Sequence, residues 1–490
     1  MIFELVGSRI IGPYVGTSTY SWTSLIGVIL ASLSLGYYFG GRLADKKPTV
    51  EPLSLILALS AIFISITALT KDFVSALVGS LPIILEFKSI IISLLLFAPA
   101  SYLLGMVSPY AVRLRARKVE SVGEMAGGLY ALSTLGSIVG TFLAGFYIIP
   151  NFGSTSALFI LTILLLVASA ILSREKSFRK SNLFFLMLIF LISTALFVCE
   201  KNVNIRKISN QKIIADLDTE YNRIWVYKGV DRMTKKPTIN LATDSYGTQA
   251  AVFADGTEDL VFSYTKYYRL AKYFTPNIKN ALTIGGCVYS QPRDFLRSNP
   301  FSSIDVVEID PGMTKAARQY FNYSDDPRLT IIHEDGRIYL NNNTKKYDAV
   351  FIDAFNSASS VPFHLTTKES AKKVFESLNS DGVMIMNLIS AVEGEKGKFL
   401  RAEYATYKEI FPQVYVFPVD DPQEGDSVQN IILVASRKPL KPTFSSENEE
   451  IATQLSHLWQ KPIASDVPVL TDDYAPVEFY KRLSIGSAGI

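Results

Sequence analysis

Cysteine, histidine and charged residues are scarce in this chain of 490 residues. It contains two cysteines and three histidines, and Asp, Glu, Lys and Arg together make up 19% of it. Two cysteines exclude a disulfide-stapled scaffold, and they cannot ligate a zinc ion by themselves. The charged fraction is below the ~25% of ordinary soluble proteins, and the mean hydropathy is +0.23. These values exclude a single soluble domain and a disordered chain, and the net charge of +3 gives no indication of nucleic-acid binding.

The scarcity of charge is concentrated in the first 200 residues. These contain 14 Lys and Arg and 9 Asp and Glu, whereas residues 201–490 contain 34 and 36. We therefore predict a multi-pass transmembrane domain at 1–200, a linker and small β region at 201–275, and a further domain at 276–490.

Six apolar runs in the first part each approach or exceed the ~20 residues that a helix needs to cross a bilayer. They cover roughly 19–41, 52–70, 89–111, 125–149, 154–172 and 182–199. The run 125–149 is dense in small residues, which let neighbouring helices approach closely. The stretch 73–87 is apolar but short and contains Pro82, so we expect it to be re-entrant or interfacial. The sequence predicts a cell-membrane protein with α-helical spans, for which the lipid bilayer is a partner.

Basic residues indicate how these spans are oriented. Eleven of the 14 basic residues of the first part lie in three loops, at 42–51, after residue 111 and at 173–181. With six spans, all three loops fall on one side, which the positive-inside rule makes cytoplasmic. The same count places everything after residue 199 on the opposite, extracytoplasmic side.

From residue 281 onward, short apolar runs alternate with stretches of helical pattern. The expected strands are Ala281–Ile284, Ile304–Glu308, Leu329–Ile332, Tyr347–Asp353 and Val383–Asn387. Nearly continuous apolar runs are typical of a parallel sheet that is buried on both faces. The predicted fold class is therefore α/β with a doubly wound parallel sheet. A small antiparallel β region precedes it, with strands at 224–227 and 238–242.

Three acids stand at or just after the ends of predicted strands, where doubly wound sheets bind their ligands. Glu308 follows Gly285 by 23 residues, and an acid at this spacing can accept hydrogen bonds from ribose hydroxyls. The pair Gly285–Gly286 permits the backbone to approach such a ligand. Asp353 can orient a nucleophile or take its proton. For Asp335, an ordinary turn is equally consistent with the sequence, and a cap or turn remains an alternative for Asp353.

Several segments match one known family in the same order along the chain. They are Gly285–Arg293, Val307–Pro311, Asp325–Arg328, Asp335–Arg337, Tyr347–Ala354 and Val361–Thr366, with Thr471–Pro476 near the end and Glu4–Arg9 at the front. On these motifs, residues 211–480 resemble the spermidine synthase (polyamine aminopropyltransferase) family. The first part resembles the membrane domain of its fused, multi-pass members.

The resemblance implies a methyltransferase-like, Rossmann-type fold. It also implies decarboxylated S-adenosylmethionine as aminopropyl donor, a small amine as acceptor, and no metal. Asp353 matches the proton acceptor, and Glu308 the acid that binds the ribose. The other residues implied on the nucleoside side are Asn222, Gly285, Gly286, Asp335, Gly336 and Pro362.

The amine-binding half of the family pattern does not match. Val288 stands where the family has an acid for the donor's ammonium, and Asn356 replaces a second Asp. Phe262–Ser263 replaces a Tyr-His pair. A cationic amine in a partly dry cleft needs an anionic partner, so adenosyl binding is better supported than polyamine synthesis. The weaker candidates for acceptor binding are Gln249, Tyr264, Tyr289 and Asn356.

Three functions therefore remain open. The first is an aminopropyltransferase, and the second is an S-adenosylmethionine-dependent transferase with a non-polyamine acceptor. The third is a transporter or sensor with a nucleoside-binding domain. It is suggested by Gly36–Lys46, which resembles a loop motif of major-facilitator transporters, and six spans would then require dimerisation. We expect a homo-oligomer. The side of the soluble part is also open, because adenosyl donors are made in the cytosol whereas the loop charges favour the outside.

Overall fold

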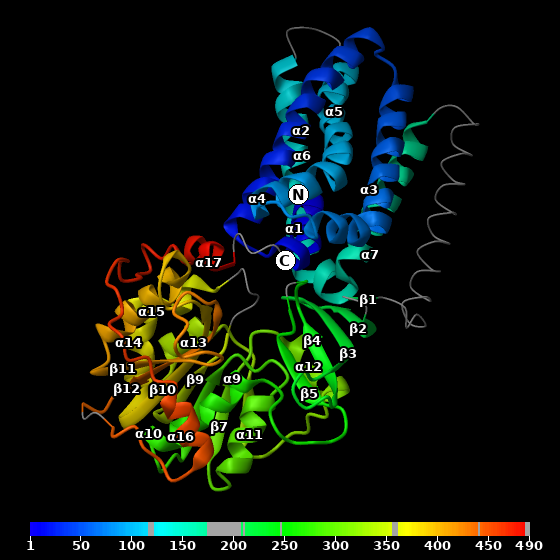
Figure 1. Cartoon of the computed structure of the whole chain (residues 1–490). Helices are drawn as coiled ribbons and strands as arrows, with labels where there is room; N and C mark the ends of the chain where they lie inside the picture. The colour runs from blue at the N-terminus through cyan, green and yellow to red at the C-terminus, as the bar shows by residue number, and fades with distance from the viewer. Residues whose placement is uncertain are drawn as a thin grey trace. The chain divides into compact units, whose positions relative to one another are not determined.

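The computed structural model describes residues 1–115, 122–173, 207–208, 211–245, 247–354, 361–439 and 442–485. The chain divides into two compact units, Met1–Arg206 and Lys207–Gly489. Figure 1 shows helices in the first unit, coloured blue to teal, and two sheets with surrounding helices in the second, coloured green to red.

The described part of the first unit is helical. Its elements are α1 (Ile2–Val15), α2 (Thr19–Lys46), α3 (Val50–Gly79), α4 (Leu85–Leu96), α5 (Ala98–Arg115), α6 (Val122–Leu143), the π-helical turn η2 (Ala144–Ile148) and α7 (Ile149–Leu172). Helix α1 was not expected from the sequence. Its side chains Val6 and Val15 are fully buried against the neighbouring helices.

The candidate spans among the described residues number fewer than the expected six. Three helical stretches, Thr19–Lys46, Val50–Gly79 and Gly123–Leu172, are long and apolar enough to cross a membrane, and the pair α4 and α5, bent by 56°, makes four if it crosses as one. The long stretch breaks at Gly153, where φ is 76°, between the spans expected at 125–149 and 154–172. The expectation for 73–87 is wrong in part, because α3 continues to Gly79. The run 182–199 lies outside the described residues.

Helices α2 and α5 approach each other through glycines. A Cβ atom on Gly36 would lie 2.2 Å from the carbonyl oxygen of Tyr102, and one on Gly40 would lie 2.6 Å from the Cα of Met106. This contact is closer than any at the small residues of 125–149 that we expected to mediate packing. There, Gly127, Gly128, Gly136 and Gly145 have no neighbouring atom within 4 Å of a built Cβ.

The helix ends that carry the basic loops lie together, as the charge pattern predicts. Arg113 Nε at the end of α5 is 2.9 Å from Asp45 Oδ1 at the end of α2. The Tyr110 hydroxyl donates to the carbonyl of Lys47. Leu172, at the end of α7, packs on the same cluster as Tyr110. The segments 42–51, 112–118 and 173–181 thus start from one end of the unit.

The second unit begins with a five-stranded antiparallel sheet. Its order is β1 (Lys207–Ile208), β2 (Gln211–Asp218), β3 (Arg223–Val230), β4 (Pro237–Ala242) and β5 (Ala250–Phe253). The two strands predicted here are confirmed as parts of β3 and β4, whereas β2 and β5 were not predicted. One face of this small sheet packs on helix α12 (Pro311–Tyr320), through Val226 and Leu241 of the sheet and Met313 and Phe321 on the helical side.

The second sheet has seven strands in the order β11-β12-β10-β9-β6-β7-β8. They are β6 (Asn280–Ile284), β7 (Ser303–Val307), β8 (Leu329–Ile332), β9 (Tyr347–Ile352), β10 (Leu378–Ser390), β11 (Gln413–Pro418) and β12 (Gln429–Ser436). Strands β6 to β10 are parallel to their neighbours, and β12 is antiparallel to both β10 and β11. The predicted doubly wound sheet is confirmed. The chain turns from one half of the sheet to the other between β6 and β9, which is the topological switch point.

Helices cover both faces of this sheet. One layer contains α13 (Gly336–Asn342), α14 (Lys368–Ser377), α15 (Lys398–Lys408) and α17 (Val477–Ile485), and the other contains α9 (Ser263–Lys266), η3 (Tyr267–Leu270), α10 (Ala271–Phe274), α11 (Ser290–Ser298) and α16 (Glu449–Ser456). Neighbouring strand residues alternate between the two cores. Val350 faces the first core and Phe351 the second, so β9 is apolar throughout.

Candidate functional site

A glycine turn at the end of β6 brings two loops into contact at the switch point. Gly285 has φ +95°, and a Cβ atom there would lie 2.3 Å from the carbonyl oxygen of Asp353. The backbone N–H of Asp353 donates to Ile284 at 3.0 Å. Only glycine meets both requirements, since a side chain would clash and the dihedral angle disfavours one. The turn therefore holds Asp353 at the carboxyl end of the sheet.

Glu308 follows β7 and holds the glycine turn from below. Its Oε2 atom accepts the backbone N–H groups of Gly286 and Cys287, each at 2.9 Å, and Oε1 accepts that of Asp310 at 3.0 Å. Burial raises the pKa of this carboxyl, which is 7% exposed, and the three N–H groups oppose the shift. The role in ribose binding stays a prediction. What the structure shows is a carboxylate that fixes the loop over which a ligand would lie.

Asp310 and Asn222 connect the small sheet to the larger one. Asp310 caps α12 by accepting from the Gly312 N–H at 2.8 Å, as the helix-cap alternative predicts for it. Its other oxygen accepts from Thr219 Oγ1 at 2.6 Å and from Asn222 Nδ2 at 3.2 Å. Asn222 is thereby fixed at the rim of the pocket described below.

Asp335 and Gly336 form the start of α13. Asp335 Oδ1 accepts the N–H groups of Arg337 and Ile338 at 2.8 and 3.0 Å, so the turn-and-cap alternative is correct. Its Oδ2 atom lies 3.3 Å from Nε2 of His364. A Cβ atom on Gly336 would lie 2.6 Å from Ile284, and glycine therefore lets α13 start directly against β6.

Asp353 has the most functional environment of the three acids. Burial raises its pKa from 3.8 to about 6, while hydrogen bonds from Asn387, Tyr264 and Tyr268 act in the opposite direction. Asn387 Nδ2 is 3.3 Å from Asp353 Oδ1. A carboxylate whose pKa lies close to neutral can accept a proton from a substrate and release it again.

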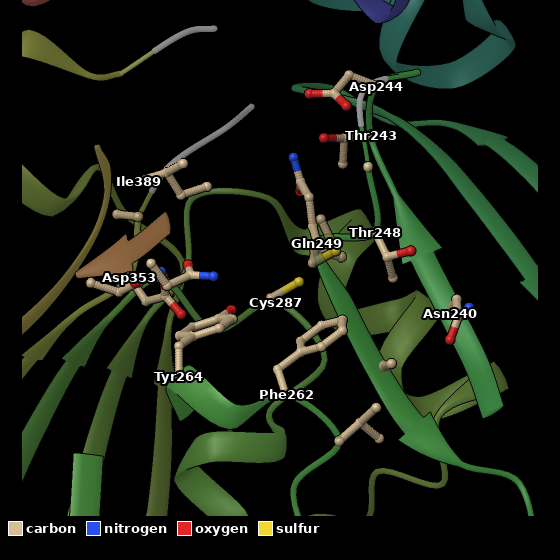
Figure 2. Close-up of a pocket in the computed structure, with 18 of the residues that line it drawn as sticks. Asn240, Thr243, Asp244, Thr248, Gln249, Phe262, Tyr264, Cys287, Asp353 and Ile389 are labelled. Carbon is tan, nitrogen blue, oxygen red and sulfur yellow. The ribbon is translucent and has the colours of Figure 1, made fainter. Parts of the chain in front are cut away.

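These residues surround one pocket with a volume of about 780 Å³. Figure 2 shows Asp353, Tyr264 and Ile389 on one side of it, with Asn240, Thr248, Thr243 and Asp244 of the small-sheet region on the other. Nine of the residues singled out from the sequence line it, namely Asn222, Gln249, Tyr264, Gly285, Glu308, Asp335, Gly336, Asp353 and Pro362. Gly286 instead borders a smaller neighbouring cavity.

Two expectations for the acceptor side fare differently. Tyr289 was expected to bind substrate, and this is wrong, because its side chain is fully buried in the core between the sheet and its helices. Its hydroxyl lies 2.6 Å from Thr314 Oγ1, and its ring stacks on Tyr323 at 4.5 Å. Asn356 lies outside the described residues. Val288 is also buried, among apolar side chains of the small-sheet core.

Sequence reasoning missed several residues that line the pocket. Asn387 ends a predicted strand, so its position at the edge of the sheet could have been read from the sequence. Asp231 and Arg232 lie in the turn after β3, Asp420 follows β11, and Asn240 lies within β4; they carried no comparable signal. Across the described ranges, no group of three His, Cys, Asp or Glu could hold a metal ion.

Comparisons with known proteins agree with this geometry. Residues 263–437 match the model of the spermine/spermidine synthase domain. The polyamine aminopropyltransferase of Vibrio vulnificus is 26% identical over 242 residues, which cover 45% of this chain and 76% of that protein. The enzyme of the same name from Clostridium perfringens is 31% identical over 155 residues, and there the chain spans only about half (53%) of the relative.

Among solved structures, a probable spermidine synthase from Corynebacterium glutamicum aligns with a TM-score of 0.41 and 21% identity, covering 56% of this chain and 94% of that one. The domain match and the aminopropyltransferase relatives both fall on the unit that contains the pocket. In this unit, the chain belongs to the spermidine synthase family.

Proposed function

We propose that this protein is a membrane-bound transferase of the aminopropyltransferase type. It binds decarboxylated S-adenosylmethionine, or a related adenosyl nucleoside, and transfers a group to an amine. The relatives named above support the reaction class, and the apolar helices of the first unit support the membrane location.

The observation that carries this proposal is the charge of the pocket around Asp353. Among the described residues that line it are seven carboxylates and a single arginine, Arg232; the acids are Asp231, Asp244, Glu308, Glu334, Asp335, Asp353 and Asp420. A cleft lined by one sign of charge concentrates ligands of the opposite sign. A sulfonium donor and an amine acceptor are both cationic. The acids lost from the family's amine site are thus offset by others from different loops.

In this proposal, Asp353 accepts the proton. The acceptor's amine nitrogen attacks the carbon next to the donor's sulfonium, forming a C–N bond as the C–S bond breaks. The electron pair of that bond neutralises the sulfur and yields 5′-methylthioadenosine, while the proton lost by the nitrogen goes to Asp353. Because the pKa of Asp353 is about 6, its carboxylate is available at neutral pH. The protein otherwise needs to position and desolvate the reactants.

The nucleoside would lie over the glycine turn. We assign its ribose to Glu308, its adenine to the edge formed by Asp335, Gly336 and Pro362, and a further contact to Asn222. All five residues line the same pocket. Glu308 already accepts three backbone N–H groups, so a ribose would use the remaining lone pairs of its oxygens.

The test is purified full-length protein incubated with decarboxylated S-adenosylmethionine and a panel of amines. We expect 5′-methylthioadenosine to form, and Asp353→Asn to lower the rate by ~10²–10⁴-fold, the usual contribution of a general base. Asp325→Asn is the matched control, because Asp325 is an exposed acid paired with Arg318. Absence of the product with every amine in the wild type would refute the proposal.

A second candidate is a transferase that uses S-adenosylmethionine and a non-polyamine acceptor. It is favoured by Val288, which is 1% exposed and packs in an apolar cluster, so this position offers no anion for the donor's ammonium. Calorimetry with the two donors separates the candidates. Tighter binding of S-adenosylmethionine than of its decarboxylated form would favour this second one.

A further inference from the structure

The pocket extends from Asp353 across the outer face of the small sheet. Figure 2 shows Asp353 and Asn240 on opposite sides of the view, with Cys287, Gln249 and Phe262 between them. The proposed reaction accounts for the end at Asp353. It assigns no ligand group to the end at Asn240.

The outer face of this sheet is polar because of how its strands alternate. Val226 and Leu241 point into the apolar core beside α12. Their neighbours Tyr227 and Asn240 are directly paired across β3 and β4 and therefore share the opposite face. A polar face of a small sheet is usually solvated, but here Tyr227 is 5% and Asn240 8% exposed. These polar groups are enclosed.

A hydrogen-bond network fixes the enclosed groups. The hydroxyls of Tyr227 and Thr248 are 2.5 Å apart. The Asn240 side chain also hydrogen-bonds Tyr227 and lowers its pKa, which assigns the Asn240 amide nitrogen as the donor. Gly229 leaves room for this arrangement, since a Cβ atom there would lie 2.3 Å from Asn240 Nδ2.

The network leaves one strong acceptor over. Asn240 Oδ1 is buried and has no hydrogen-bond partner among the described residues, although Asn240 lines the pocket. Buried amide oxygens are rarely left unsatisfied in native proteins, and a fixed, unsatisfied acceptor on a pocket wall is suited to an N–H or O–H donor of a ligand. Asp244 and Asp231 line the same pocket, which favours a donor that carries positive charge.

We infer that Asn240 Oδ1, with Thr248 beside it, forms a subsite for the far amino group of an extended amine acceptor. The near amino group of the same molecule would lie at Asp353, where the proposed transfer occurs. The inference rests on the proposed function for the class of substrate. It adds that the acceptor is a linear diamine or longer polyamine, and that a polar residue of the small sheet selects it over a monoamine.

The test compares pairs of amines that differ only at the far end. The probes are 1-aminobutane with 1,4-diaminobutane and 1-aminopentane with 1,5-diaminopentane, titrated calorimetrically into full-length protein with 5′-methylthioadenosine present. We expect the wild type to prefer at least one diamine over its monoamine by about tenfold or more, as a hydrogen bond to a charged group gives. In Asn240→Leu this ratio should fall to about one while the monoamine affinity stays unchanged.

Further variants keep the test independent of folding defects. Thr248→Val removes the neighbouring hydroxyl with little change of shape and should lower the same ratio. Asn240→Asp keeps an acceptor oxygen and adds charge, so the preference should persist or increase. Asn342→Ala, at an exposed asparagine that ends α13, should leave the ratio as in the wild type.

The outcomes separate this inference from the proposed function. A wild type that binds diamines and monoamines equally, or an Asn240→Leu variant that keeps the wild-type ratio, overturns the subsite, even if 5′-methylthioadenosine is formed. The second result would mean that water alone satisfies Asn240. A ratio that collapses in Asn240→Leu supports the subsite, even if no transfer product is ever detected and the reaction proposal fails.

Discussion

At the scale of single residues, the site depends on how much burial each carboxylate undergoes and what compensates it. Glu308 is buried but accepts three backbone N–H groups, which stabilise its charged form. Asp353 has a weaker set of donors, with Asn387 at 3.3 Å, and its pKa rises to about 6. The same chemical group therefore fixes a loop at one strand end and exchanges a proton at the next.

The pKa of Asp353 predicts the pH dependence of the transferase. As a base, Asp353 acts only when deprotonated, so kcat/KM should fall as the pH drops through about 6. Asn387→Leu removes a donor that lowers this pKa, and the acidic limb of the profile should therefore move to higher pH. The measurement is initial rate against pH for the wild type and the variant.

Two controls belong with this profile. Asn342→Ala should leave the limb where it is. Because folding raises the pKa of this acid from 3.8 to about 6, its charge destabilises the fold above that pH and has no effect well below 3.8. Asp353→Asn should accordingly raise the melting temperature at about pH 8 but not at about pH 4. An unchanged melting temperature at both pH values would argue against a buried, perturbed Asp353.

Residue positions at the site were only partly predictable from the sequence. The three acids could be found because each stands at or just after a strand end, and all three line the pocket. Tyr289 could not be excluded, since the sequence does not show that its left-handed backbone, with φ 60°, directs the ring into the core. Asn240 was missed because a polar residue in an alternating strand is indistinguishable from one that faces solvent.

At the scale of elements, the sequence predicted what depends on local pattern and missed what depends on partners. All five parallel strands were expected from their apolar runs. The antiparallel pair β11 and β12 and the short strand β5 were not, because pairing direction is set by contacts distant along the chain. In the membrane unit, glycine content drew attention to 125–149, but the close contact lies between α2 and α5. Composition shows where helices can approach, not where they do.

The α2–α5 contact makes a prediction with a matched control. In Gly36→Ala, the new Cβ atom would lie 2.2 Å from the Tyr102 carbonyl, so the two helices must separate. Membrane helices associate mainly by close packing, and we expect a loss of several kcal/mol, as for overpacked cores, seen as a lower melting temperature in detergent. Gly128→Ala, with no atom within 4 Å, should be neutral or slightly stabilising. Equal effects of the two substitutions would contradict the observed packing.

At the scale of the whole molecule, membrane topology decides whether the proposed reaction has access to its donor. The three basic segments start from one end of the helical unit, as shown by the Arg113–Asp45 ion pair and by Leu172 beside Tyr110. The positive-inside rule makes that end cytoplasmic. Residue 173 is then on the cytoplasmic side, and the side of the second unit depends only on whether 182–199 crosses the bilayer.

The proposed function predicts that it does not cross. An adenosyl donor made in the cytosol requires the pocket on that side, so reporter domains fused after residue 181 and after residue 490 should both report the cytoplasm. A control fusion in the turn between α3 and α4, after residue 82, should report the opposite side, because α3 is one of the candidate spans. If the fusions at 181 and 490 report opposite sides, then 182–199 spans the membrane and the pocket faces away from the cytosol. A transferase that depends on a cytosolic donor would then be excluded, whatever the geometry of its acids.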